Sequence, residues 1–189
     1  MSIAEPHLTV EQFLEMFENG RLPDPDHSEL LDGRIVIRTA KSPLAATCLA
    51  LAHEAFRVIL PSGWRLRNQS SIRTTDSIPE PDLAIVRGPA RDYAQRRPGP
   101  GDTVMVVEIS DSSLRQDRTL KSRIYARAGI AVYWIVNIVD AQVEVYNDPT
   151  GPDPAPSYRG RAEYRDDDPI PVVIDGVEVG RIVARNILP

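Results

Sequence analysis

Residues 103–121 combine an apolar strand with two charged side chains at positions where burial is costly. The stretch reads TVMVVEISDSSLRQDRTLK, and residues 103–109 have the apolar continuity of a buried strand. Glu108 falls near the end of that strand, and Lys121 falls on the apolar stripe of a helix predicted over 117–128. Because buried charges are tolerated mainly when they are paired, this pattern predicts a polar site at one end of a sheet.

A second carboxylate is predicted to lie close to the first. Asp82 stands at the start of another apolar strand, 81–86, and shares a face with alternate residues of that strand. By the same alternation, Val104, Val106 and Glu108 are expected to share one face of their own strand. If the two strands pair, Asp82 and Glu108 meet at one edge of the sheet. Two neighbouring carboxylates repel each other, so their burial requires a compensating cation or proton.

Lys121 is the cation that the sequence offers for this purpose. It lies one helical turn after Asp117, and Tyr125 follows one turn later. An ordinary ion pair between Asp117 and Lys121 is the alternative interpretation. Two carboxylates and a lysine suit metal-dependent phosphodiester hydrolysis, in which oxygen ligands hold Mg²⁺ and the lysine orients water or stabilises developing charge.

The rest of the pattern predicts one domain, residues 1–189, in which strands and helices are interleaved. This order favours an α/β or α+β fold with a mixed sheet. Thr9 and Gln12 form a capping box, and Asp-Gly pairs predict the turns of the first and last hairpins. The predicted helices cover 10–19, 43–60 and 117–128; the predicted strands and hairpins cover 28–38, 64–68, 70–75, 81–86, 103–109, 131–147 and 170–183; residues 148–157 are a predicted loop.

Positive charge is concentrated in one segment although the net charge is −5. That net charge argues against a protein that coats nucleic acid by bulk attraction. Four arginines nevertheless lie within residues 87–97, directly after the strand that carries the aspartate, so this segment is predicted to contact phosphates. A solvated loop is the alternative. The arginines are Arg87, Arg91, Arg96 and Arg97.

Two further residues are predicted to serve packing. Cys48 is the only cysteine, which excludes an internal disulfide and favours a reducing cytoplasm. Trp134 alternates with Val132 and Val136 on one face of a strand, so we expect it to be buried, with a partner for its indole N–H. We expect no secretory signal, because the first residues, MSIAEPHLTVEQF, carry no apolar run. We expect no membrane span, because the chain lacks eighteen consecutive apolar residues.

The motifs and their order resemble the Uma-two family of restriction endonucleases, a branch of the PD-(D/E)XK nuclease superfamily. The shared segments are ELLDGRIV, PEPDLAIV and VVEISDSSLRQDRTLKSRIYARAGIAVYWIVN, and the resemblance runs from about Thr9 to the C-terminus. It implies a restriction-endonuclease-like core, with a mixed central sheet flanked by helices and a hairpin near each end. It also implies Mg²⁺- or Mn²⁺-dependent endonuclease activity on DNA.

The resemblance also implies roles for individual residues. Asp82 is the acid of the PD motif and Glu108 is the second acid, and both are implied metal ligands. The standard motif lysine would stand two residues later, at Ser110, whereas Lys121 matches the position of the lysine on the following helix in the Uma-two pattern. Glu29 matches an N-terminal acid that is either a further ligand or an exposed hairpin carboxylate.

Two rival functions remain open at this point. Relatives often carry a histidine near the start of the long helix, which SPLAATC lacks, and this departure favours a catalytically inactive nucleic-acid-binding or scaffold protein. The other rival is an enzyme that uses Lys121 as an amine nucleophile. We favour the endonuclease, with Asp117 and Tyr125 supporting the catalytic residues and a homodimer suited to symmetric cleavage of duplex DNA.

Overall fold

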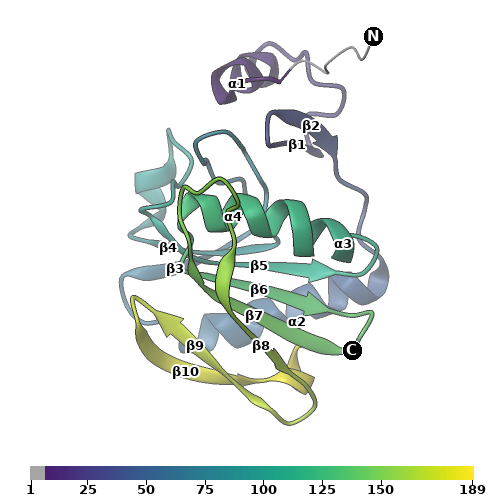
Figure 1. Ribbon diagram of the computed structural model, residues 1–189, viewed down its shortest axis with the longest axis vertical. Coiled ribbons are helices and arrows are strands. Elements are labelled where there is room, and N and C mark those ends of the chain that lie inside the picture. The colour runs from purple at the N-terminus through teal and green to yellow at the C-terminus, as the bar shows by residue number, and fades with distance from the viewer. Residues whose placement is uncertain (1–6) are drawn as a thin grey trace.

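A six-stranded mixed sheet forms the centre of the molecule, which the computed structural model describes over residues 7–189 (Figure 1). The strand order is β3-β4-β5-β6-β7-β8. β5 and β6 are parallel and the other neighbours are antiparallel, which confirms the expected mixed sheet. The strands are β3 (Trp64–Asn68), β4 (Leu83–Arg87), β5 (Thr103–Ser110), β6 (Val132–Asn137), β7 (Gln142–Pro149) and β8 (Tyr158–Tyr164).

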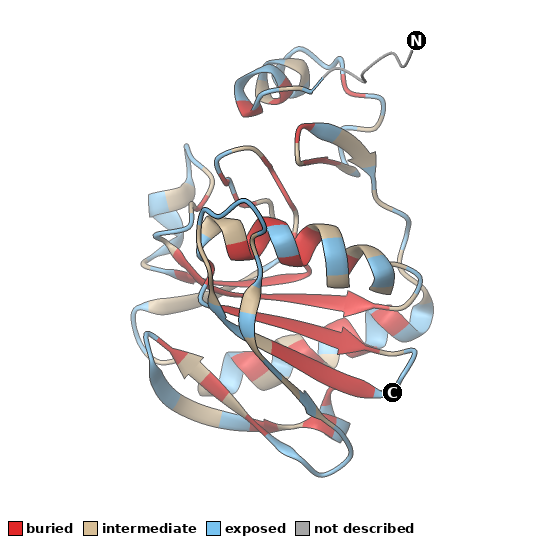
Figure 2. Cartoon of the chain, viewed as in Figure 1, coloured by how far each residue is buried: buried red, intermediate tan, exposed pale blue. Residues whose placement is uncertain are grey.

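Helices cover both faces of this sheet (Figure 1). α2 (Pro43–Ile59) packs on one face, and α4 (Ser122–Ala128) packs on the other. Successive strand side chains therefore alternate between two apolar clusters, one beside each helix. Every residue of β5 and β6 is buried, as Figure 2 shows. Burial of both faces explains why these strands read as continuous apolar runs in the sequence.

Two hairpins flank the sheet, as the sequence predicts. The first consists of β1 (Ser28–Leu31) and β2 (Arg34–Ile37), and the second of β9 (Pro169–Ile174) and β10 (Val177–Val183). In each turn an Asp-Gly pair has positive φ at both residues, 52° and 75° in the first turn and 49° and 79° in the second. Such turns match the twist of the strands they join.

The remaining elements are short. The capping box of α1 (Val10–Glu18) is confirmed: the Gln12 N–H donates to the Thr9 hydroxyl, and the Gln12 side chain accepts from the Thr9 N–H. Single 3₁₀ turns, η1 (Ala90–Tyr93) and η3 (Ala184–Asn186), follow β4 and β10.

The prediction of a strand over residues 70–75 is wrong. The Ile72 N–H bonds to the Pro79 carbonyl and the Thr74 N–H bonds to the Ser77 carbonyl, so this segment folds back on itself in a turn. The opposite error concerns β8, which the sequence did not predict. β8 is an edge strand with several exposed charged residues, and such residues mask the apolar alternation on which a strand prediction depends.

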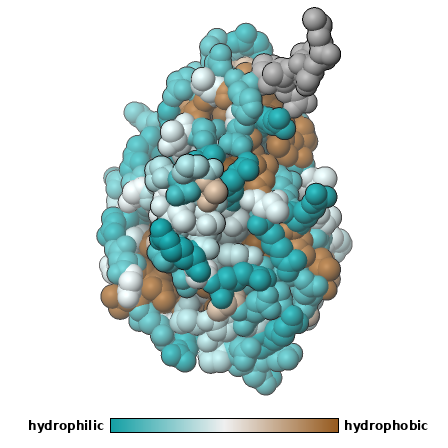
Figure 3. Space-filling model, in the orientation of Figure 1, coloured by the Kyte–Doolittle hydropathy of each residue, from teal (hydrophilic) through white to brown (hydrophobic). Residues whose placement is uncertain are grey.

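Most of the surface shown in Figure 3 is hydrophilic, with hydrophobic side chains gathered beside the N-terminal hairpin. Within residues 7–189, no helix combines the length and the apolarity needed to cross a membrane.

Trp134 is fully buried and lies 5.1 Å from the Phe56 ring, measured between ring centroids. Its predicted role in packing is confirmed. The predicted partner of the indole N–H is not found, because the indole nitrogen has no hydrogen bond among the described residues. Cys48 is also buried, as expected, and burial raises the pKa of its thiol.

Trp134→Ala is expected to lower the free energy of unfolding by about 3–5 kcal/mol, because it leaves a cavity in the core. Trp134→Phe should cost much less, since it keeps an aromatic ring and removes an unpaired buried N–H. Urea unfolding followed by circular dichroism measures both changes. Equal losses for the two variants would contradict this account of the core.

Candidate active site

The register of β4 against β5 brings two carboxylates to one edge of the sheet. Ala84 lies opposite Val106 and Leu83 lies opposite Val107. Continuing that register by one residue places Asp82 opposite Glu108, and both residues are buried. The backbone fixes one of the carboxylates, because the Ile109 N–H donates to Asp82 Oδ2 at 2.7 Å.

A β-bulge corrects one expectation about β5. Thr103 lies opposite Val86 and Met105 lies opposite Ile85, so Val104 is an extra residue without a partner on β4. Val104 therefore packs in the cluster beside α2, whereas Val106 packs on the opposite face. The prediction that these two valines share a face is wrong, because a bulge reverses the alternation on one side of itself.

Lys121 lies between two carboxylates. Its Nζ is 3.0 Å from Glu108 Oε1 and 3.2 Å from Glu29 Oε1, and its side chain is only 7% exposed. The Tyr125 hydroxyl donates to the same Glu108 oxygen at 2.7 Å, and the Glu80 N–H donates to Glu29 Oε1 at 2.6 Å. The structure therefore gathers the predicted Lys121, Glu108, Glu29 and Tyr125 into one buried cluster.

This cluster keeps the lysine charged. Burial by itself lowers the pKa of the Lys121 ammonium, but the nearby carboxylates of Glu108, Glu29 and Asp117 outweigh burial and raise that pKa above its ordinary value. Lys121 is therefore a hydrogen-bond donor and not a proton acceptor at neutral pH.

A π-helical turn presents Lys121 to the sheet. α3 (Leu114–Gln116), the π turn η2 (Asp117–Lys121) and α4 form one continuous helical segment. The Ser122 N–H bonds to the Asp117 carbonyl, five residues earlier, and that carbonyl also accepts from the Tyr133 hydroxyl at 3.2 Å. Such turns change which residues face inward and are frequent at functional sites.

Asp117 does not form the alternative ion pair with Lys121 within the described part of the chain. Its carboxylate instead accepts from the Ser110 and Ser113 hydroxyls, each at 2.6 Å. Burial and the charge of Glu108 raise the pKa of the Asp117 carboxyl to about 6. Ser110 thus anchors the helical segment that carries Lys121.

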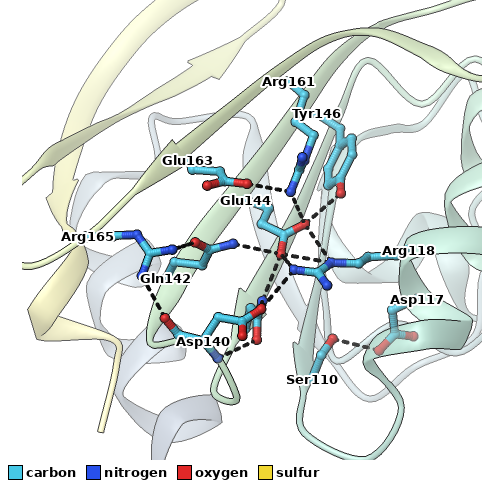
Figure 4. A network of polar contacts seen from close by, with 11 residues as sticks. Ser110, Asp117, Arg118, Asp140, Gln142, Glu144, Tyr146, Arg161, Glu163 and Arg165 are labelled. Atoms are coloured by element: carbon cyan, nitrogen blue, oxygen red, sulfur yellow. Dashed lines mark hydrogen bonds and ion pairs between the residues drawn. The ribbon is translucent and has the colours of Figure 1, made fainter.

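A second polar network holds this helix against the sheet (Figure 4). Arg118, in the π turn, contacts the fully buried Glu144 on β7, with Nη2 2.5 Å from Oε1. Burial by itself raises the pKa of Glu144, but hydrogen bonds from Arg118, Tyr146 and Asn137 among others outweigh burial and lower that pKa to about 2. The Arg118–Glu144 contact therefore fixes the helix three residues before Lys121.

Asp82 contacts a lysine of its own, Lys41, which is not among the predicted site residues. Lys41, in the linker between β2 and α2, places its Nζ 2.7 Å from Asp82 Oδ2 and 3.3 Å from the Ile109 carbonyl oxygen. Burial and the charge of Glu108 raise the pKa of the Asp82 carboxyl to about 6, against the opposing effect of Lys41.

Composition carried a signal for Lys41. The sequence has twenty-two basic residues, and only Lys41 and Lys121 among them are lysines. Both of these lysines contact the buried acids. A lysine ammonium is a compact charge that fits between two oxygens, whereas the planar guanidinium of arginine demands a fork-shaped partner.

These residues line a cleft of about 690 Å³. Its charged walls include Glu29, Lys41, Glu80, Asp82, Glu108, Asp111, Asp117 and Lys121. A neighbouring groove of about 460 Å³ shares Ser112, Ser113, Val36 and Gln116 with the cleft and contains Arg34 and Arg115.

The four predicted arginines do not lie in this cleft. Arg87 ends β4, at the opposite end of the strand from Asp82, and none of the four lines the cleft. Arg87 and Arg96 are each paired with an aspartate, Arg97 donates to a serine hydroxyl, and Arg91 is exposed. Segment 87–97 therefore lies away from the acids. It begins at the last residue of β4, whereas Asp82 directly precedes the first residue.

The donor set suits a hard divalent cation that keeps most of its water. Oδ1 of Asp82 and Oε2 of Glu108 take part in no hydrogen bond among the described residues. Within residues 7–189 no three His, Cys, Asp or Glu side chains form a metal cage. Mg²⁺ does not need such a cage, since it is commonly bound by one or two carboxylates and several waters.

A family model described as "Putative restriction endonuclease", Uma2, matches residues 10–174. The chain belongs to the Uma2 family. The match includes every predicted catalytic and metal-binding residue. The fold agrees with the crystal structure of a putative nuclease belonging to DUF820 from Anabaena variabilis ATCC 29413, with a TM-score of 0.72 and 14% identity over 95% of this chain and 97% of that one. No curated protein matches the chain.

Asp117→Asn tests the electrostatics of the site. Because the pKa of this carboxyl is raised to about 6 in the folded protein, the folded state binds its proton more readily between about pH 4 and 6. In the wild-type protein, the Asp117 carboxyl therefore adds to the free energy of unfolding below about pH 4. This contribution is lost as the pH rises through about 6. The variant should flatten this dependence and gain about 1–3 kcal/mol at pH 7.5, measured by urea unfolding across pH 4–8.

Asp102→Asn is the matched control. The hydrogen bond from Arg96 lowers the pKa of the Asp102 carboxyl, so this group contributes stability of the opposite slope, which is lost as pH falls. Identical pH profiles for the two variants would contradict the electrostatic description of the cleft.

Proposed function

We propose that this Uma2-family protein is a Mg²⁺- or Mn²⁺-dependent endonuclease that hydrolyses phosphodiester bonds in DNA. One observation carries the proposal: Asp82 and Glu108 face each other across paired strands, with Lys121 buried against Glu108, in an open cleft. Family membership supports a nuclease, and the donor set supports a hard cation.

The residues divide the work by charge. Asp82 and Glu108 would hold the cation, with Glu29 close enough to assist through Lys121. When bound, such a cation polarises the phosphoryl group and makes a bound water more acidic. Lys121 donates a hydrogen bond to the attacking water or to the phosphoryl oxygens, because its raised pKa keeps it protonated. Tyr125 orients Glu108 through its hydroxyl.

The same raised pKa argues against Lys121 as an amine nucleophile. Schiff-base chemistry requires a neutral amine, which enzymes obtain by lowering a lysine pKa through burial or a neighbouring cation. Here three carboxylates act in the opposite direction.

A non-catalytic nucleic-acid-binding protein is the second candidate, and one observation favours it. Both proposed cation ligands already have a lysine within ion-pair distance, Asp82 with Lys41 and Glu108 with Lys121. The cleft is therefore partly charge-balanced by the protein alone. Binding of DNA without any dependence on a divalent cation would favour this candidate.

The decisive assay is nicking of supercoiled plasmid DNA in Mg²⁺ or Mn²⁺. Asp82→Asn should abolish cleavage and cation binding. Lys121→Met should still bind the cation but cleave about 10²–10³-fold more slowly, the usual cost of removing one donor to the transition state. At a hundred times its dissociation constant, the cation should stabilise the wild-type fold by about 2.7 kcal/mol.

Asp102→Asn and Arg123→Met are the matched controls, because both side chains lie outside the cleft and form exposed ion pairs. The assigned roles would be refuted if Lys121→Met nicked DNA at the wild-type rate. They would also be refuted if either control lost as much nicking activity as Lys121→Met.

The route of the DNA strand gives a separate test. The groove beside the cleft contains Arg115, whose side chain forms no hydrogen bond or ion pair within residues 7–189. Arg115→Ala should weaken DNA binding at all sequences and reduce the salt dependence of the affinity by about one phosphate contact. Arg96→Ala should have less effect, since Arg96 already pairs with Asp102 at 2.6 Å. Fluorescence anisotropy measures both affinities. If Arg96→Ala weakens DNA binding more than Arg115→Ala does, segment 87–97 and not the groove contacts the DNA.

A homodimer in the cytoplasm is the setting we propose for this activity. A two-fold dimer would present one copy of the cleft to each strand of a duplex, which suits symmetric cleavage. The single cysteine, buried in α2, is compatible with a reducing compartment.

A further inference from the structure

Lys41 gives the cleft an ammonium that the proposed mechanism does not use. Its side chain is 23% exposed, against 7% for Lys121, and its Nζ contacts only Asp82 Oδ2 and the Ile109 carbonyl oxygen among the described residues. A carboxylate oxygen and a backbone carbonyl oxygen are both ligands that hard divalent cations prefer. The ammonium therefore lies where such a cation would gain the same two oxygens.

The linker that carries Lys41 is fixed at its ends and exposed between them. Arg38 Nη2 lies 2.6 Å from Glu80 Oε1 at one end. At the other end the Ser42 hydroxyl donates to Asp111 and accepts from the Ala45 N–H, where α2 begins. The intervening Thr39 and Ala40 are exposed. The flexible four-carbon side chain of Lys41 can move away from Asp82 without any change in β2 or α2.

We propose that Lys41 is a tethered cation that competes with a divalent ion for Asp82 and Ile109, and that swings into the cleft when the ion binds. This inference rests on the proposed cation dependence. Its physical basis is charge repulsion: an ion on the free Asp82 Oδ1 would lie only a few ångströms from the ammonium on Oδ2, and an ion that also takes the Ile109 carbonyl oxygen would occupy the ammonium's own place. The displaced ammonium keeps three donors and lies in the wall of the cleft, where it contacts a phosphate oxygen of the substrate.

Chemical labelling of the wild-type protein tests the displacement directly, because the chain has only two lysines. Reductive methylation followed by peptide mass spectrometry reads each lysine separately. Saturating Mg²⁺ should accelerate methylation of Lys41 several-fold relative to NaCl of equal ionic strength. Lys121, which is buried between two carboxylates, should remain slow in both conditions.

Calorimetry of Lys41→Met tests the competition. Removing the ammonium should tighten Mg²⁺ binding by on the order of tenfold, since a unit charge a few ångströms from the ion is lost. Arg123→Met is the matched control: it removes a cation that lies outside the cleft and pairs with Asp32 and not with Asp82. The control should leave the Mg²⁺ affinity nearly unchanged.

The outcomes separate this inference from the proposed function. If wild-type protein and Lys41→Met bind Mg²⁺ equally and labelling of Lys41 does not change, the competition is refuted while the metal-dependent nuclease stands. If only Lys41→Met binds Mg²⁺, the competition is supported and the wild-type protein is not a Mg²⁺ enzyme under those conditions. If neither binds Mg²⁺ or Mn²⁺, both proposals fail.

Discussion

The pairing of β4 with β5 creates the electrostatic problem that the rest of the site resolves. Its register places the carboxylates of Asp82 and Glu108 opposite each other at an edge where both residues are buried. At an effective dielectric constant of about 20, two unit charges about 4 Å apart interact by about 4 kcal/mol. Repulsion of this size is sustained only with positive charge alongside, and the chain provides Lys41 and Lys121 from segments far apart in sequence.

Lys121 holds its place because the helix before it is fastened to the sheet on two sides. Ser110 and Ser113 bind the Asp117 side chain, and Arg118 contacts Glu144 within the network of Figure 4. The π turn between these anchors directs the lysine inward. Lys121 thus reaches Glu108 on β5 from the following helix, because its position is set by packing and not by distance along the chain.

The fold by itself says little about chemistry. A structure with 14% identity shares it over nearly the whole chain, so this architecture accommodates extensive sequence replacement. Function therefore depends on the cleft: its acids, its two lysines and the adjoining groove. The arginine segment after β4 is an example: it is positively charged, but none of its four arginines lines the cleft that contains the acids.

Elements whose causes are local could be predicted from the amino-acid sequence. Periodicity and turn chemistry predicted both Asp-Gly hairpins, the capping box of α1, the end of α4 at Ala128 and the placement of Glu108 on an apolar strand. Asp82, expected at the start of its strand, lies directly before β4. The fold class followed from their order and from the family resemblance. Each of these features depends on residues within a few positions of one another, so a single sequence contains the information.

Features that depend on strand register and on the path of the chain could be seen only in the folded structure. The bulge at Val104, the strand β8, the π turn and the contact of Lys41 with Asp82 all arise from packing between distant segments. Which lysine faces which acid follows from the path of the linker after β2 and from the way the helical segment lies on the sheet. Those paths depend on the packing free energy of the whole core, and no short segment of the sequence contains enough information to predict it.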